Sequence, residues 1–131
     1  MRSKSLVRER ILQILYYVGY SYPYEIYKIY KSLYGKVCLR NVYYNIRKGI
    51  EAGDIKVLKV ETVDGNFTWG DKTKRIYLIP NPLRPVQPLP QDYLKKLNGL
   101  KKKFTEVERE EIIKKLGKKE EVIKWVNSFS D

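Results

Sequence analysis

The chain has 131 residues, of which 27 are basic and 15 acidic, so its formal net charge at pH 7 is +12. This length suits one domain with an extension, and the basic surplus predicts a polyanionic partner, although thermophile proteins are also Lys-rich. The sequence has no apolar run of about 18 residues, which excludes a membrane span, and its charged N-terminus argues against a secretory signal. The lone cysteine, Cys38, excludes an internal disulfide or thiolate metal site. We expect a cytoplasmic protein with Cys38 half-buried.

The positive charge is unevenly distributed along the chain. Residues 1–53 hold ten basic and three acidic side chains, residues 54–90 six and four, and residues 91–131 eleven and eight. The excess therefore lies in the first segment, whereas the last segment carries both signs, as a solvated helix surface does. A flexible basic tail is predicted from four N-terminal cations: Arg2, Lys4, Arg8 and Arg10.

Two helices are predicted before residue 36. The first spans about residues 5–18, and its apolar side chains point to two sides, so we expect it to lie at the centre of the domain. The second begins at Pro23, whose missing N–H suits a first helical turn, and Gly35 ends it. We assign most tyrosines at helical spacing to core packing rather than to base stacking, namely Tyr27, Tyr30, Tyr34 and Tyr43.

The helix predicted over residues 39–53 has one apolar and one cationic face. The predicted buried face consists of side chains at helical spacing: Leu39, Val42, Tyr43, Ile46 and Ile50. The other face carries candidate DNA contacts: Arg40, Asn41, Tyr44, Arg47 and Lys48. In a major groove, arginine pairs with guanine O6 and N7, and asparagine with adenine N6 and N7. Arg47 and Lys48 could instead contact only phosphates, and a solvated surface helix is the simpler alternative.

A β-hairpin is predicted after the helix stop at Gly53. Its strands span about residues 55–63 and 75–79 and flank the turn residues 64–66. Three cations are the candidate contacts to the DNA backbone or minor groove: Lys72, Lys74 and Arg75. In the loop between the two strands, Phe67 and Trp69 either pack the loop or stack on a base, and packing is the preferred interpretation.

The remaining chain predicts a proline-rich segment followed by short helices. Five of the six prolines fall within residues 80–90, which indicates an extended linker or a strap across the domain, with a PxxP ligand as the alternative. Short helices are predicted near residues 91–100, 105–116 and 118–129, the second with a capping box of Thr105 and Glu108. Because about 40 residues make a poor independent domain, these helices should dock on their own domain or on a second subunit. The apolar stripe of the last helix is predicted from Val122, Ile123, Val126 and Phe129, with Trp125 on its flank.

These elements predict an α+β fold. Residues 1–80 form a winged helix-turn-helix of three helices and a β-hairpin wing, residues 81–90 a Pro-rich linker or strap, and residues 91–131 a helical extension for dimerisation or docking.

Three segments within residues 6–80 carry a family resemblance. The second helix contains YPYEIYKIYKSLYG, the third contains VYYNIRKGIEAGDI, and the returning strand contains RIYLI. This pattern resembles the winged-helix regulators of the PadR-like group. Pro23 replaces a glycine of that pattern, and Gly49 replaces a buried leucine, which predicts the close approach of another backbone to this helix. The resemblance implies a homodimer formed through the C-terminal helices.

We therefore expect a sequence-specific regulator of transcription that binds double-stranded DNA without a cofactor, through its recognition helix and wing. The alternative is a winged-helix protein-interaction module in a replication, transcription or ribonucleoprotein assembly. An enzyme is disfavoured because the chain has no histidine, the commonest general base near neutral pH. Three acidic residues near the wing match no metal motif: Glu61, Asp64 and Asp71. The target site and any effector ligand stay open.

Overall fold

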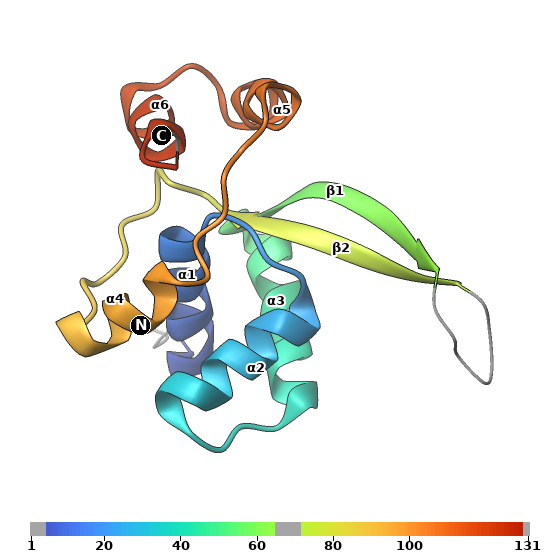
Figure 1. The fold of residues 1–131 in the computed structure, drawn as a ribbon, viewed down its shortest axis with the longest axis vertical. Helices are drawn as coiled ribbons and strands as arrows, with labels where there is room; N and C mark the ends of the chain where they lie inside the picture. Colours follow the sequence, from blue (N-terminus) through green and yellow to red (C-terminus); the bar gives the residue numbers. More distant parts are fainter. Residues whose placement is uncertain (1–4, 65–71, 130–131) are drawn as a thin grey trace.

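The computed structural model describes residues 5–64 and 72–129. Over these residues the chain forms an α+β fold in which three helices precede an antiparallel hairpin and three follow it (Figure 1). The elements in chain order are α1 (Leu6–Val18), α2 (Pro23–Tyr34), α3 (Leu39–Ala52), β1 (Ile55–Asp64), β2 (Lys72–Pro80), α4 (Gln91–Asn98), α5 (Glu106–Leu116) and α6 (Glu120–Asn127).

Local sequence determines where the helices begin and end. The Ser5 hydroxyl caps α1 by accepting the backbone N–H of Arg8 at 3.4 Å. The capping box of Thr105 and Glu108 forms at α5, with hydrogen bonds of 3.1 and 2.9 Å. Gly53 ends α3 with a φ of 83°, a left-handed conformation that a side chain would strain. Element order and type therefore agree with the sequence, and β2 is longer than predicted.

Helix α1 lies at the centre of the domain, as the sequence predicts. Helices α2 and α3, the hairpin base and α4 all contact it and form a first core around it. Four neighbouring apolar side chains of α1 are almost completely buried there: Ile11, Leu12, Ile14 and Leu15. Packing on several sides of α1 thus explains why its apolar side chains are not confined to one side.

The base of the hairpin is covered on both faces. Val57 and Leu78 pair across the strands and join the first core, whereas Leu58 and Ile79 belong to a second core with α5 and α6. An irregularity in the register between Val57 and Lys59 accompanies this change of side. Figure 1 shows α5 and α6 on the opposite side of the hairpin base from α3. The C-terminal helices therefore dock on their own domain.

The second core is aromatic, and it buries the predicted stripe residues Val122, Val126 and Phe129 but not Ile123. Trp125 is buried, while Ile123, predicted in the stripe, is exposed. The reason is that α6 packs against the end of α1, where the Trp125 indole N–H donates to the backbone carbonyl of Tyr16 at 2.9 Å. The ring centroids of Trp125 and Phe129 are 5.0 Å apart, and Phe104 lies within 5.5 Å of both.

Residues 81–90 run across α1 and are held there by polar contacts. The Arg84 guanidinium forms hydrogen bonds of 2.7 and 3.0 Å with the Glu9 carboxylate and an ion pair of 3.2 Å with Asp54. Further along, the Gln13 amide donates to the backbone carbonyl of Gln87 at 3.0 Å. This segment is therefore a strap that connects the hairpin to α4 over the surface of α1.

Candidate nucleic-acid interface

Helix α3 is buried along one side and presents the candidate DNA contacts on the other. Its buried residues are Val42, Asn45, Ile46 and Gly49. Its exposed polar residues include four of the sequence-predicted contacts, Arg40, Asn41, Tyr44 and Arg47, with Lys48 half-exposed beside them. One rigid helix thus brings these five side chains together on the outside of the domain.

The buried face of α3 is narrower than the sequence predicts. Leu39, Tyr43 and Ile50 are expected in the core, yet they are 36%, 42% and 39% exposed. The helix packs against α1, α2 and β1, and only the row that contains Val42 and Ile46 points between these elements. Three large apolar side chains consequently flank the polar ones on the outer face.

Gly49 explains why α3 lies so close to the hairpin. A Cβ atom at this position would lie 2.6 Å from Cδ1 of Ile55, whose side chain is fully buried. The close approach predicted at Gly49 is therefore real, but the neighbour is the Ile55 side chain rather than a backbone. The absence of a side chain lets β1 begin directly beneath the helix.

Asn41 is held in place by a second asparagine one turn later. The Asn45 amide Nδ2 donates to Oδ1 of Asn41 at 2.8 Å and to its backbone carbonyl at 2.9 Å. Asn45 is only 2% exposed, and its own Oδ1 has no hydrogen-bond partner within the part of the chain that the structure describes. The pair restricts the Asn41 rotamer and leaves its Nδ2 donor available. Sequence reasoning missed Asn45, although its i, i+4 spacing from Asn41 was a usable signal.

The cations of α3 differ in how freely they can contact a ligand. Among residues 5–64 and 72–129, Arg40 and Arg47 have no hydrogen-bond or ion-pair partner for their side chains. Lys48, by contrast, lies 3.5 Å from the Glu51 carboxylate and 5.6 Å from the ring centroid of Tyr44. Arg40 and Arg47 are therefore more available than Lys48 for contact with a ligand.

The hairpin cations point to different sides. Because side chains alternate along a strand, Lys74 shares the face of Leu78, which packs on the first core beside α3. Arg75 lies on the other face, 4.4 Å above the Tyr22 ring, and a hydrogen bond to the Tyr77 hydroxyl raises its pKa. Lys74 thus lies on the hairpin face that packs on the first core at its base, and Arg75 lies on the opposite face. The backbone of Lys72 lies opposite that of Asp64 at the end of the described hairpin, and Phe67 and Trp69 lie outside the described residues.

Cys38 is exposed, and the expectation that it is half-buried is wrong. It occupies the N-cap position of α3, where the connector turns outward before the first helical residue. The pKa of its thiol is lowered because the backbone N–H groups of Asn41 and Arg40 favour the thiolate. The thiol therefore lies beside Arg40 and Asn41, the residues for which base contacts are predicted.

Two of the arginines predicted in a flexible tail belong to helix α1. Arg10 donates to the Tyr30 hydroxyl at 3.2 Å and lies 4.2 Å from the ring centroid of Tyr34. Arg8 is also half-buried on α1. Stacking on core tyrosines, which sequence spacing could not reveal, explains the difference. Arg2 and Lys4 lie outside the described residues.

Two further observations concern membrane insertion and metal binding. No helix within residues 5–64 and 72–129 has the length and apolar character needed to cross a bilayer. The same residues bring together no group of three His, Cys, Asp or Glu side chains that could hold a metal ion. Comparisons of the chain with protein-family models, curated proteins and solved structures find no match.

Proposed function

We propose that the chain is a winged-helix protein that binds double-stranded DNA and regulates transcription, with α3 in the major groove and the hairpin on the backbone or minor groove. The observation that carries this proposal is the outer face of α3. There, Arg40 and Arg47 are unpaired within the described residues, and Asn41 is oriented by Asn45. Such a helix, anchored on one side and cationic on the other, suits the major groove.

The proposal divides the side chains into two roles. Arg40 and Asn41 lie in the first turn of α3, the end that usually contacts base edges, and they contact bases. Tyr44 and Arg47 follow one and two turns later on the outer face. Phosphate contacts, which position the protein without base recognition, come from the lysines of α3 and of the hairpin: Lys48, Lys72 and Lys74. Arg75, which stacks on Tyr22 on the other face of the hairpin, has no part in this division of roles.

Selection of bound sites from random duplex DNA, followed by fluorescence anisotropy on the selected sequence, tests the proposal. We expect a sequence motif and an affinity that falls steeply with salt, because each neutralised phosphate adds about −0.9 to the slope of log K against log salt. The triple variant Lys114→Ala/Lys118→Ala/Lys119→Ala, altered at exposed lysines of α5 and the following turn, controls for net charge. Absence of duplex binding at low salt would refute the function.

The proposal includes a homodimer formed through the C-terminal helices. Most of their large apolar side chains are used within the chain, but Val107 of α5 is 70% exposed and Ile123 of α6 is exposed as well. Light scattering should give twice the 15.6 kDa mass of one chain, and Val107→Asp should restore the single-chain mass. A single-chain mass for the unaltered protein at DNA-binding concentrations would remove the dimer from the proposal.

A protein-interaction module is the second candidate, and one observation favours it. Val60 and Ile76 pair across the hairpin and are 56% and 42% exposed, on the face that also carries Lys74. An exposed apolar pair on the hairpin is a contact that a protein partner would use. Affinity purification of the native protein and of Val60→Ser/Ile76→Ser distinguishes the candidates. A stoichiometric partner that only the variant loses, with unchanged duplex affinity, supports the module.

A further inference from the structure

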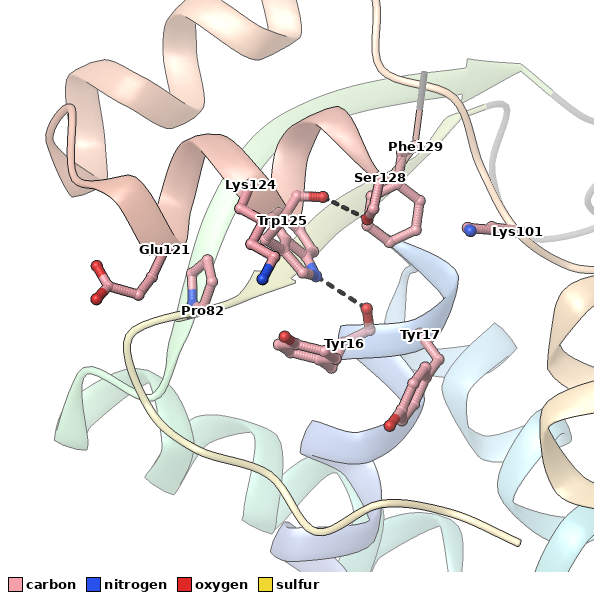
Figure 2. A pocket seen from close by; sticks show the side chains of 9 residues that line it. All are labelled: Tyr16, Tyr17, Pro82, Lys101, Glu121, Lys124, Trp125, Ser128 and Phe129. Carbon is pink, nitrogen blue, oxygen red and sulfur yellow. Dashed lines mark hydrogen bonds between the residues drawn. The ribbon is translucent and has the colours of Figure 1, made fainter. Parts of the chain in front are cut away.

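A branched groove lies on the side of α1 that faces α4 and α6. Its largest hollow, about 480 Å³, opens between α1 and α6 (Figure 2), and hollows of about 320 and 270 Å³, which share lining residues with it, lie along α4 and along the strap. Tyr17 lines all three hollows, and Lys101 lines the first two. We call this surface the Tyr17 groove. Its extended form distinguishes it from a closed pocket for one small molecule.

The walls of the Tyr17 groove are aromatic. Trp125 and Phe129 are nearly buried and form one wall, and the half-buried rings of Tyr16 and Tyr17 lie below them in Figure 2. The Tyr16 and Tyr17 rings meet edge to face at 5.4 Å, and both side chains are only half-buried, so part of each stays accessible. The hydrogen bond from Trp125 to the Tyr16 backbone fixes the two walls relative to each other. A flat unsaturated group therefore finds rigid ring surfaces here.

The rim of the Tyr17 groove is positively charged. Lys95, Lys101 and Lys124 line it and are exposed, and Glu121 is the one carboxylate among the residues that line the three hollows. None of the three lysines has an ion-pair partner in the described part of the chain. The Lys101 ammonium lies 5.1 Å from the Phe129 ring centroid, directly beside the aromatic wall. The charge of the rim is thus complementary to a string of anions.

The groove is separate from the proposed duplex-binding face. Figure 1 shows α3 and α4 on opposite sides of α1, and α6 lies beyond the hairpin base from α3. Both surfaces can therefore be occupied at once. An occupant of the Tyr17 groove needs no contact with Arg40 or Lys74.

We infer that the Tyr17 groove binds a short segment of single-stranded nucleic acid. Unpaired bases stack on Tyr17 and Tyr16, and phosphates lie against Lys95, Lys101 and Lys124. Proteins that bind single strands combine a cationic groove with aromatic side chains in this way, because every base has a flat face. A duplex offers no such face, since its bases are stacked on one another. This inference stands on a different surface and does not rest on the proposed duplex function.

Fluorescence anisotropy with a labelled oligo(dT) of about 15 nucleotides, titrated with the full chain at about 50 mM salt, tests the inference. We expect Lys95→Ala/Lys101→Ala/Lys124→Ala to weaken binding roughly tenfold, since it removes three phosphate contacts. Tyr17→Leu keeps an apolar side chain but removes the ring, and should weaken binding at least fivefold. The lysine control variant at positions 114, 118 and 119 should bind nearly as the unaltered chain does. Each variant is also titrated with duplex DNA, whose affinity the two groove variants should leave unchanged.

Several results would overturn the inference. One is no oligo(dT) binding by the unaltered chain, and another is an equal loss in the groove and control lysine variants. A third is competition by saturating duplex together with loss of oligo(dT) binding in Arg40→Ala/Arg47→Ala, because that result places the strand on α3. Thymidine monophosphate that binds the groove as tightly as the oligonucleotide would identify a small-molecule site instead. Because the lysine variants change only exposed side chains, the test remains decisive even if Tyr17→Leu does not fold.

Discussion

Helices α3 and α6 are both amphipathic, but the domain uses them in opposite ways. Helix α6 turns its largest side chain, Trp125, into the second core, and its outer face carries both charge signs. Helix α3 buries Gly49 and Asn45 among its inner residues and keeps both of its tyrosines outside with its arginines. Helix α6 therefore contributes its largest side chain to the core, whereas the outer face of α3 is the surface that we propose contacts a ligand.

The largest expected effect tests α6 as an anchor. Trp125→Ala should lower the free energy of unfolding by about 3–5 kcal/mol, because it leaves a cavity and removes the hydrogen bond to Tyr16. Urea unfolding followed by circular dichroism measures this loss. Ile123→Ala, at an exposed position of the same helix, should cost less than about 1 kcal/mol. Equal effects of the two changes would show that α6 does not anchor the domain.

The next effect tests α3 as the recognition helix. Arg40→Ala and Asn41→Ala should each lose about 1–3 kcal/mol of discrimination between the selected duplex and one altered at the contacted base pair. Lys74→Ala should weaken both duplexes to the same extent and reduce the salt slope by about one unit. Anisotropy titrations on the two duplexes measure both quantities. If the three variants behave alike, the division between base and phosphate contacts is wrong.

A smaller effect tests the link between the hairpin and the C-terminal helices. The Lys59 ammonium lies 2.7 Å from the buried Glu108 carboxylate, and Glu108→Gln should destabilise the chain by about 1–2 kcal/mol while keeping the capping box. Lys59→Met and the double variant complete a cycle that isolates the pair. A coupling energy near zero would show that this contact does not hold α5 to β1.

The pH dependence of the same pair has a definite sign. Burial raises the pKa of Glu108, but the hydrogen bonds from Lys59 and Thr105 outweigh it and hold the pKa below the ordinary 4.5. A carboxyl group with a lowered folded-state pKa stabilises the fold above its unfolded pKa and loses that contribution as pH falls through the folded value. The difference between the unaltered chain and Glu108→Gln should therefore be complete at neutral pH and shrink below about pH 4.5. A difference that grows on acidification would contradict this account.

The smallest expected effect separates packing from positioning within α3. Asn45→Ala removes a buried amide with one unpaired oxygen, so the free energy of unfolding should change by less than about 1 kcal/mol. Base discrimination should nevertheless relax several-fold, because Asn41 loses the partner that restricts its rotamer. Parallel unfolding and selection measurements compare the two quantities. A large loss of stability with unchanged discrimination would make Asn45 a packing residue only.

Prediction from the sequence succeeded where short-range chemistry decides. Glycines, Pro23 and the capping pair at α5 place the helix ends, because these features act within one turn of the backbone. Burial was harder to predict on the outer helices. Tyr43 and Ile123 fit an apolar stripe in the sequence, yet they are 42% and 38% exposed in the fold. The spacing of apolar residues along one helix does not show how much of that helix the packing elements will cover.

The sequence by itself determined the order and type of the elements, the cationic face of α3 and the need for the last helices to dock. Only the tertiary structure decided which surfaces those helices cover, that Arg75 stacks on Tyr22 while Lys74 lies on the opposite face of the hairpin, and that Asn45 holds Asn41. The physical reason is the separation along the chain of the groups that interact. Helix caps and strand alternation depend on neighbours in the chain, whereas a free cation or an accessible ring depends on groups that only folding brings within a few ångströms.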